Sequence, residues 1–185
     1  MLSTILHTYP SPIGEMVAVF SPEGLRLLEF LGQPRVDREM AQVEAAAGGP
    51  AVEGQNALTK QLGRELVEYF AGERRSFDIP LDLLGTPFQL QVWKALLEIP
   101  YGETWSYGRE AHHIGRPTAS RAVAAANGQN KVSIVVPCHR VIGGDGNLTG
   151  YGGGLPRKQF LLALEKESSQ PQGQLWQTPN IGSTS

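Results

Sequence analysis

The sequence predicts an α+β fold, with a small N-terminal α/β domain over residues 1–80 and a mainly helical C-terminal domain over residues 86–167. Two observations predict this division. Short runs of β type come first and helical periodicity follows them, whereas the second half carries a helix-turn-helix pattern ahead of the chain's single cysteine. With 185 residues, 41% of them hydrophobic, the chain is long enough to bury a core. Residues 168–185 have the polar composition of a disordered tail.

The N-terminal domain is expected to contain a short antiparallel sheet. Residues 16–20 and 25–30 are β-type runs separated by a Ser-Pro-Glu-Gly turn, a pattern that predicts a hairpin. Residues 33–55 lose periodicity and predict mainly loop with some helix. Apolar residues then recur at helical spacing over residues 58–70, and Gly72 predicts the end of that helix.

The C-terminal domain is expected to follow a connector over residues 77–84. Thr86 and then Pro87 predict the start of a helix, because proline is favoured in the first helical turn. That helix is expected to end before Pro100.

Two further helices give the helix-turn-helix pattern. Ser106 can cap the first, over residues 107–114, and the second is expected to open at residues 116–118 and to run to residue 126. Two packed core helices would produce the same pattern without DNA. The second helix carries one long polar residue, Arg121, among alanines, which favours close minor-groove contact over the reading of base edges in the major groove.

The distribution of charge supports an anionic partner for the second half. The net charge of −2 by itself argues against a nucleic-acid binder. However, residues 1–85 carry 7 Lys and Arg against 12 Asp and Glu, whereas residues 86–165 carry 8 against 5. A basic second half beside an acidic first half favours contact between the second half and an anion.

Cys138 is the only cysteine, so an internal disulfide, a CxxC redox pair and a multi-cysteine zinc site are all excluded. An inert buried thiol and a nucleophile remain as alternatives. Pro137 ends the apolar run before the cysteine, because proline cannot continue a strand ladder. His139 and Arg140 place positive charge beside the sulfur, which predicts a lowered thiol pKa.

The cysteine count and the pattern of apolar residues predict the cellular compartment of the protein. One cysteine and no evident signal peptide favour the reducing cytoplasm. No apolar stretch approaches the roughly 20 residues of a membrane helix, so no membrane partner is expected. The pair His112 and His113 is interpreted as surface or packing, and no metal site is expected.

Several motifs of the second half resemble one known family, the methylated-DNA–protein-cysteine methyltransferases, also called O6-alkylguanine-DNA alkyltransferases. The motifs are Ser106-Tyr107-Gly108, Ser120-Arg121-Ala122-Val123, Asn130 and Pro137-Cys138-His139-Arg140-Val141. The resemblance covers roughly residues 85–165 and is highly specific, while the N-terminal half matches in outline only. It implies a helical domain that binds DNA and repairs guanine alkylated at O6.

The resemblance assigns four residues to catalysis. Cys138 would attack the alkyl carbon in one in-line displacement, and His139 would accept the thiol proton through a water. Glu165 would orient the histidine, following the nucleophile–base–orienter logic of a catalytic triad. Asn130 would hold the turn before the strand of the cysteine.

The resemblance also assigns the binding of DNA. A target base inside a duplex must be flipped out before its O6 group can reach a thiol. Arg121 would fill the vacated stack, with Ser120 and Ala122 beside it in the DNA-binding set. Tyr107 would contact the flipped base and promote its rotation.

The substrate pocket is expected beside a loop over residues 143–154, which holds seven glycines. Tyr151 and Lys158 match pocket residues, and the lysine would help the leaving guanine become neutral. The carbonyl of Val141 would accept from the guanine amino group. Gly152 stands where some relatives carry Ser, so its backbone N–H would be the remaining donor to O6.

For partners, the resemblance implies a monomer that binds double-stranded DNA containing O6-alkylguanine, mainly through the minor groove, and that needs no cofactor. O4-alkylthymine would be a second substrate. The family's optional N-terminal zinc site needs cysteines that this chain lacks. Two other function classes compete: a non-catalytic regulator that binds alkylated DNA, and a cysteine hydrolase that turns over repeatedly.

Overall fold

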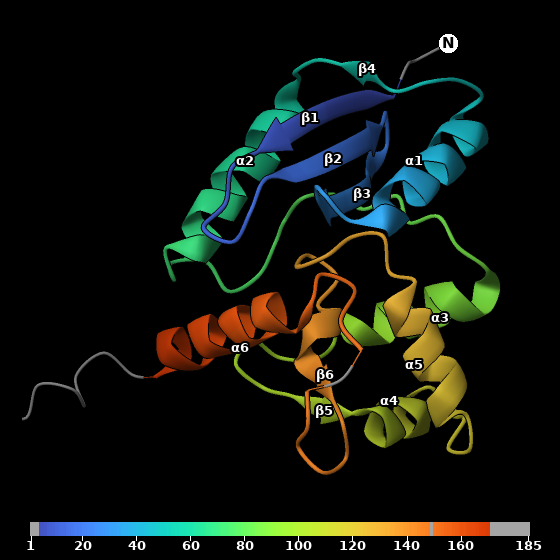
Figure 1. Ribbon diagram of the computed structural model, residues 1–185, viewed down its shortest axis with the longest axis vertical. Coiled ribbons are helices and arrows are strands. Elements are labelled where there is room, and N and C mark those ends of the chain that lie inside the picture. The colour runs from blue at the N-terminus through green and yellow to red at the C-terminus, as the bar shows by residue number, and fades with distance from the viewer. Residues whose placement is uncertain (1–3, 149, 171–185) are drawn as a thin grey trace, which may run out of the picture.

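The computed structural model describes residues 4–148 and 150–170. The N-terminal part is built on a β-sheet with a helix on each side, and the C-terminal part is built mainly from helices (Figure 1). The α+β class predicted from the sequence is therefore confirmed. Residues 171–185 of the expected tail lie outside the described residues.

The N-terminal sheet has four strands in the order β3-β2-β1-β4. The predicted hairpin is present as β2 (Met16–Ser21) and β3 (Gly24–Phe30), which pair antiparallel. Strand β1 (Ile5–Tyr9) was not predicted from the sequence, and it pairs antiparallel with β2. The short β4 (Val52–Glu53) pairs parallel with β1. The antiparallel pairing that we expected is present, and the short parallel pair of β1 with β4 makes the sheet mixed.

Helix α1 (Pro34–Ala47) occupies much of the region that we expected to be mainly loop. Its inner face is narrow and includes a carboxylate, because the buried residues are Val36, Glu39 and Val43. They recur at helical spacing, but two valines and a glutamate make a weak apolar signal. Val36 and Val43 pack against one face of β2 and β3. Burial on the sheet therefore stabilises a helix whose own pattern is poor.

Helix α2 (Ala57–Phe70) covers the opposite face of the sheet and agrees with the predicted helix. Asn56 caps its N-terminus by accepting from Thr59 N at 3.0 Å. Its buried face carries Leu62, Leu66 and Tyr69, which reach the main core. This face extends the core from the sheet toward the C-terminal part.

The C-terminal helices begin with α3 (Pro87–Leu96), which Thr86 caps as predicted. Helix α4 (Tyr107–His113) starts at the predicted cap, where Ser106 Oγ accepts from Arg109 N at 3.0 Å.

Helix α5 (Ser120–Gly128) starts later than the expected residues 116–118. The N–H of Ala119 bonds to the carbonyl of Arg116 at 3.0 Å and closes a turn there. The last helix, α6 (Leu155–Ser169), includes two residues of the expected tail.

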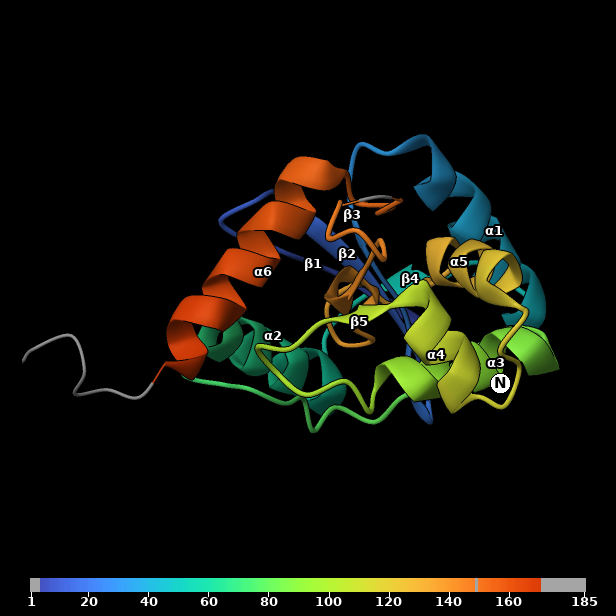
Figure 2. The ribbon, with the colours of Figure 1, turned by 90° about the horizontal axis from the view of Figure 1, so that it is seen from below.

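Two short strands, β5 (Trp105–Ser106) and β6 (Val141–Ile142), pair in parallel at the centre of the C-terminal part. Seen from below, α6 lies on one side and α3, α4 and α5 lie on the other, with β5 between them (Figure 2). The strands therefore hold together the two groups of helices.

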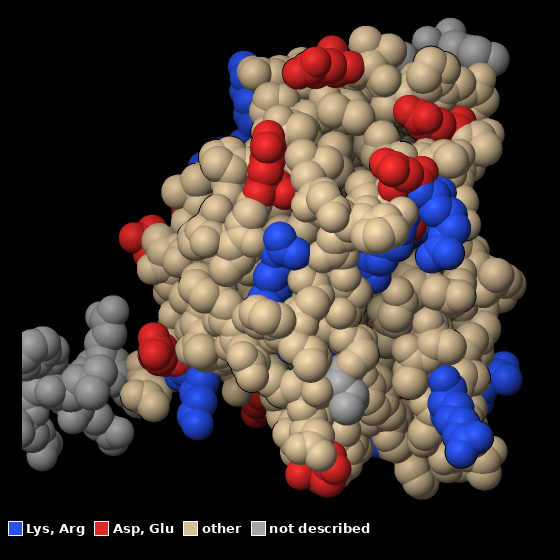
Figure 3. Space-filling view, in the orientation of Figure 1, with Lys and Arg blue, Asp and Glu red and all other residues tan. Residues whose placement is uncertain are grey.

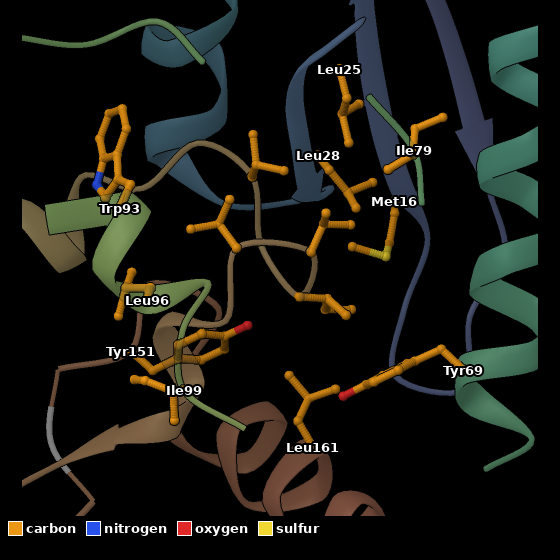
Figure 4. Close-up of a cluster of buried hydrophobic side chains, with 14 of the residues drawn as sticks. Met16, Leu25, Leu28, Tyr69, Ile79, Trp93, Leu96, Ile99, Tyr151 and Leu161 are labelled. Atoms are coloured by element: carbon orange, nitrogen blue, oxygen red, sulfur yellow. The ribbon is translucent and has the colours of Figure 1, made fainter. Parts of the chain in front are cut away.

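Both halves share one buried cluster (Figure 4). Met16 and Leu28 of the sheet belong to it together with Leu96 of α3 and Leu161 of α6. The backbone also joins the halves, because Leu28 exchanges hydrogen bonds with the segment at Lys131 and Ser133, at 2.8 and 2.9 Å. The segment that leads to the cysteine is thus anchored on the edge of the N-terminal sheet.

Candidate active site

A tight turn, and not the expected strand, leads to Cys138. Only Val132 forms a β-bridge, with Leu28, and Ile134 takes a left-handed φ of 71°. Asn130 holds this turn from the inside: its Nδ2 donates to Val136 O at 2.9 Å, and its Oδ1 accepts from Val132 N at 3.0 Å. A backbone conformation that costs energy at a β-branched residue is thus held by a buried amide.

Cys138 begins a single 3₁₀ turn that continues through His139 and Arg140. Asn130 Nδ2 lies 3.2 Å from the sulfur and donates to it. Burial nevertheless raises the pKa of the Cys138 thiol to about 11. The lowered thiol pKa that we expected from the neighbouring cations is therefore wrong, because the side chains of His139 and Arg140 both contact Glu165. At neutral pH the thiol is protonated, and forming a thiolate requires a base.

Glu165 is the centre of a buried hydrogen-bond network. Its Oε2 accepts from His139 Nε2 at 2.7 Å and from Tyr69 Oη at 2.7 Å, and its Oε1 accepts from Arg140 Nε at 2.7 Å. Burial opposes ionisation of Glu165, but His139 and Arg140 outweigh it and hold the pKa at about 2. Glu165 is therefore an anion that orients the imidazole.

His139 is fully buried, and its imidazole is held by Glu165. Burial lowers its pKa, against the opposing effect of Glu165, so the neutral imidazole is favoured. With the Nε2 proton directed at Glu165, Nδ1 is the free acceptor, and it has no hydrogen-bond partner among the described residues. A single water at this nitrogen could link it to the thiol.

Lys158 and Val141 meet beside the cysteine. Lys158 Nζ donates to Val141 O at 2.6 Å, and the side chain is almost completely buried. Burial lowers the pKa of Lys158, while Cys138 opposes that effect. Tyr151 of the glycine-rich loop is also buried, and Cys138 contributes to raising its pKa, after burial itself. The Lys158 and Tyr151 side chains, the Val141 carbonyl and the thiol therefore lie in one region.

Arg35 of the N-terminal part reaches the same loop, a contact that sequence reasoning missed. Its Nη2 donates to both carboxylate oxygens of Glu29, at 2.9 and 2.8 Å, and its Nη1 donates to Gly128 O at 3.1 Å. A Cβ added to Gly152 would lie 1.6 Å from Arg35 Nη1, so the guanidinium occupies the space of a side chain there. A glutamate near the end of strand β3, where Arg26 is the one other charged residue, was the available signal.

The expected DNA-binding residues lie on the outer face of α5. Arg121 and Ala122 are exposed and Ser120 is half-buried, while the opposite face packs Val123 into the core. Tyr107 of α4 lies beside the glycine-rich loop, because a Cβ on Gly150 would lie 3.6 Å from its hydroxyl. Basic side chains appear over the lower right of the view in Figure 3, the part of the molecule formed by α4 and α5.

Metal ligands and membrane-spanning helices were not expected from the sequence. Within the described residues, no three His, Cys, Asp or Glu side chains cluster as metal ligands would. His113 instead packs its ring against Trp105, with 4.9 Å between the centroids. None of the described helices is long and apolar enough to span a bilayer.

Comparisons with known proteins agree for both halves of the chain. Residues 87–167 match the family described as 6-O-methylguanine DNA methyltransferase, DNA binding domain. Residues 5–83 match the ribonuclease-like domain of the same family. A methylated-DNA–protein-cysteine methyltransferase of Methanosarcina acetivorans is 46% identical over 158 residues, which cover 85% of this chain and 95% of that protein. One from Mycobacterium tuberculosis is 50% identical over 163 residues, covering 86% and 91%.

Solved structures give the same result. The crystal structure of the M. tuberculosis O6-methylguanine methyltransferase superimposes with a TM-score of 0.79 at 46% identity, covering 90% of this chain and 95% of that one. A structure of the M. tuberculosis protein in complex with DNA superimposes with a TM-score of 0.77 at 46% identity, covering 89% and 94%.

Proposed function

Since this chain belongs to the 6-O-methylguanine DNA methyltransferase family, we propose that Cys138 is the residue that accepts the alkyl group from O6 of guanine. The protein repairs DNA by direct reversal of alkylation. The sulfur–carbon bond forms as the carbon–O6 bond breaks. The leaving guanine anion takes up one proton, which balances the proton that the thiol gave up, and ordinary guanine is the product. The product is a thioether, which is no leaving group, so each molecule reacts once. O4-alkylthymine is proposed as a second substrate of the same displacement.

The observation that carries this proposal is the buried His139–Glu165 pair next to a thiol whose pKa is about 11. Such a thiol needs a base, and a neutral imidazole with a free Nδ1 can take its proton through one water. Glu165, already ionised, then stabilises the imidazolium. Asn130 fixes the turn and donates to the sulfur, which orients the nucleophile.

The leaving guanine is proposed to bind between the glycine-rich loop and α6. Val141 O would accept a hydrogen bond from the exocyclic amino group of guanine. This bond would compete with the hydrogen bond that Val141 O now accepts from Lys158. The Lys158 ammonium would then be available to stabilise the negative charge that develops on the base. Tyr151 and the backbone N–H of Gly152 would complete the pocket. Gly152 has no hydroxyl to offer, and Arg35 occupies the space in which a side chain would lie.

Binding of DNA is supported by the relative solved in complex with DNA. We propose that this chain binds as a monomer in the cytoplasm, with the smooth outer face of α5 in the minor groove. Arg121 would fill the space left by the flipped base, between Ser120 and Ala122, and Tyr107 would promote rotation of that base. Residues 86–167 would form the reacting domain, and residues 1–80 would support it.

The test is a count of product per protein on duplex DNA that carries O6-methylguanine. One equivalent is expected, with mass spectrometry placing one added methyl group on the peptide that contains Cys138. The Cys138→Ala variant should bind the duplex and transfer nothing. Many equivalents would instead indicate a hydrolase, no transfer would indicate a regulator, and a methyl group on another residue would refute the mechanism.

A further inference from the structure

We propose that Tyr69 is a positioning residue for alkyl transfer, holding the Glu165 carboxylate in place for His139 from the N-terminal domain. The inference rests on the proposed roles of His139 and Glu165. It gives the N-terminal half, which carries none of the proposed reacting groups, a direct part in the chemistry.

Tyr69 lies on the last turn of α2, 96 residues before Glu165 in the chain. Its ring is completely buried and packs against Phe70 and Phe77, with centroids 5.3 and 5.4 Å away. The hydroxyl points away from α2 toward α6, where Leu161 lies one turn before Glu165 (Figure 4). The hydrogen bond to Glu165 Oε2, at 2.7 Å, thus joins α2 to α6.

The oxygen that Tyr69 contacts is the one that orients His139. Both Tyr69 Oη and His139 Nε2 donate to Glu165 Oε2, at 2.7 Å each. Arg140 holds the other oxygen at 2.7 Å and reaches Oε2 with Nη2 at 3.2 Å. Tyr69 and Arg140, which come from different elements, therefore fix the plane of the Glu165 carboxylate. That plane in turn sets the direction of the His139 imidazole.

The phenol also reduces how strongly Glu165 attracts a proton onto His139. A hydrogen bond to an anion spreads its charge, so removing one leaves more negative charge facing Nε2. The other groups that face this network stay in place: Arg140 and Lys158 are cations near His139, and Tyr101 lies near Tyr69. Loss of the Tyr69 hydroxyl should therefore favour the imidazolium and weaken His139 as a base at low pH.

The experiment compares Tyr69→Phe with Tyr101→Phe in single-turnover transfer across pH. Tyr101 lies in the same cluster, 6.4 Å from Tyr69 between ring centroids, and its buried hydroxyl has no hydrogen-bond partner among the described residues. Both changes remove one oxygen and keep the ring, so Tyr101→Phe is a matched control.

Tyr69→Phe should slow transfer on the pH plateau by roughly tenfold or more, the worth of one hydrogen bond to a charged group. The acid limb of its rate profile should move to higher pH. Tyr101→Phe should change neither. Equal effects of the two variants, or an unmoved acid limb in Tyr69→Phe, would overturn the inference.

A double-mutant cycle with Glu165→Gln separates this inference from the proposed function. If Tyr69 acts through Glu165, adding Tyr69→Phe to Glu165→Gln should slow transfer little further. If Tyr69→Phe slows transfer by the same factor in the wild type and in Glu165→Gln, Tyr69 acts through the fold alone. Wild-type rates in Glu165→Gln itself would refute the proton relay, whatever Tyr69 does.

Discussion

Replacing Glu110 with Gln is expected to stabilise the protein at high pH, although it removes a charge. Glu110 of α4 and Asn127 of α5 face each other inside the helix-turn-helix, and both are buried. Asn127 Nδ2 donates to Glu110 Oε2 at 2.8 Å. The other two atoms, Glu110 Oε1 and Asn127 Oδ1, have no hydrogen-bond partner among the described residues. A carboxylic acid or an amide at residue 110 can donate a hydrogen bond to Asn127 Oδ1, but a carboxylate cannot.

The magnitude follows from the pKa of Glu110, which burial raises from 4.5 to about 7 against the opposing effects of Asn127 and His113. Below pH 4.5 the side chain is neutral in both the folded and the unfolded states. As the pH rises to 7, the unfolded state ionises first, so folding loses stability. At about 1.4 kcal/mol for each tenfold change in proton affinity, the loss reaches about 3 kcal/mol above pH 7.

Urea denaturation at pH 5 and pH 8 measures this loss. Because glutamine does not ionise, Glu110→Gln should exceed the wild type by up to about 3 kcal/mol at pH 8 and differ little at pH 5. Glu103→Gln removes the same charge from an exposed position and should not change that pH dependence. Burial also raises the pKa of Glu29 to about 8, so Glu29 adds its own pH dependence to the free energy of unfolding. That contribution is the same in every variant. Equal gains at both pH values, or a loss at pH 8, would refute the reasoning.

Two further predictions concern DNA and the loop. Arg121→Ala should slow repair of duplex DNA by about tenfold or more but leave reaction with a free O6-alkylguanine base within about twofold, because the free base needs no extrusion; equal losses in the two single-turnover assays would place Arg121 in the fold instead. Gly152→Ser should lower stability by about 1–3 kcal/mol in urea, because the new side chain must displace the Arg35 guanidinium. In an Arg35→Ala background the serine should cost much less, whereas additive costs would show that the two residues do not compete for space.

The local elements that the sequence predicted correctly have signals within a few residues. Thr86 with Pro87, and Ser106 before its helix, mark helix starts that the structure contains. The hairpin at β2 and β3 follows from a four-residue turn between two apolar runs. Helix α1 was only partly expected, because its buried face carries Glu39 between two valines and its apolar periodicity is weak. The packing of that face on the sheet is a tertiary contact, which the sequence pattern does not show.

The sequence by itself determined the class of fold, the single candidate nucleophile and the family that the comparisons confirm. Only the tertiary structure decided what surrounds that nucleophile. His139 and Tyr69 meet Glu165 across 26 and 96 residues of chain, and the burial that raises the thiol pKa comes from atoms of several elements. Residue type and spacing specify local caps, turns and periodicity, because those interactions span a few residues. Desolvation and hydrogen bonding at the site depend on which distant segments pack together, and that packing exists only in the folded chain.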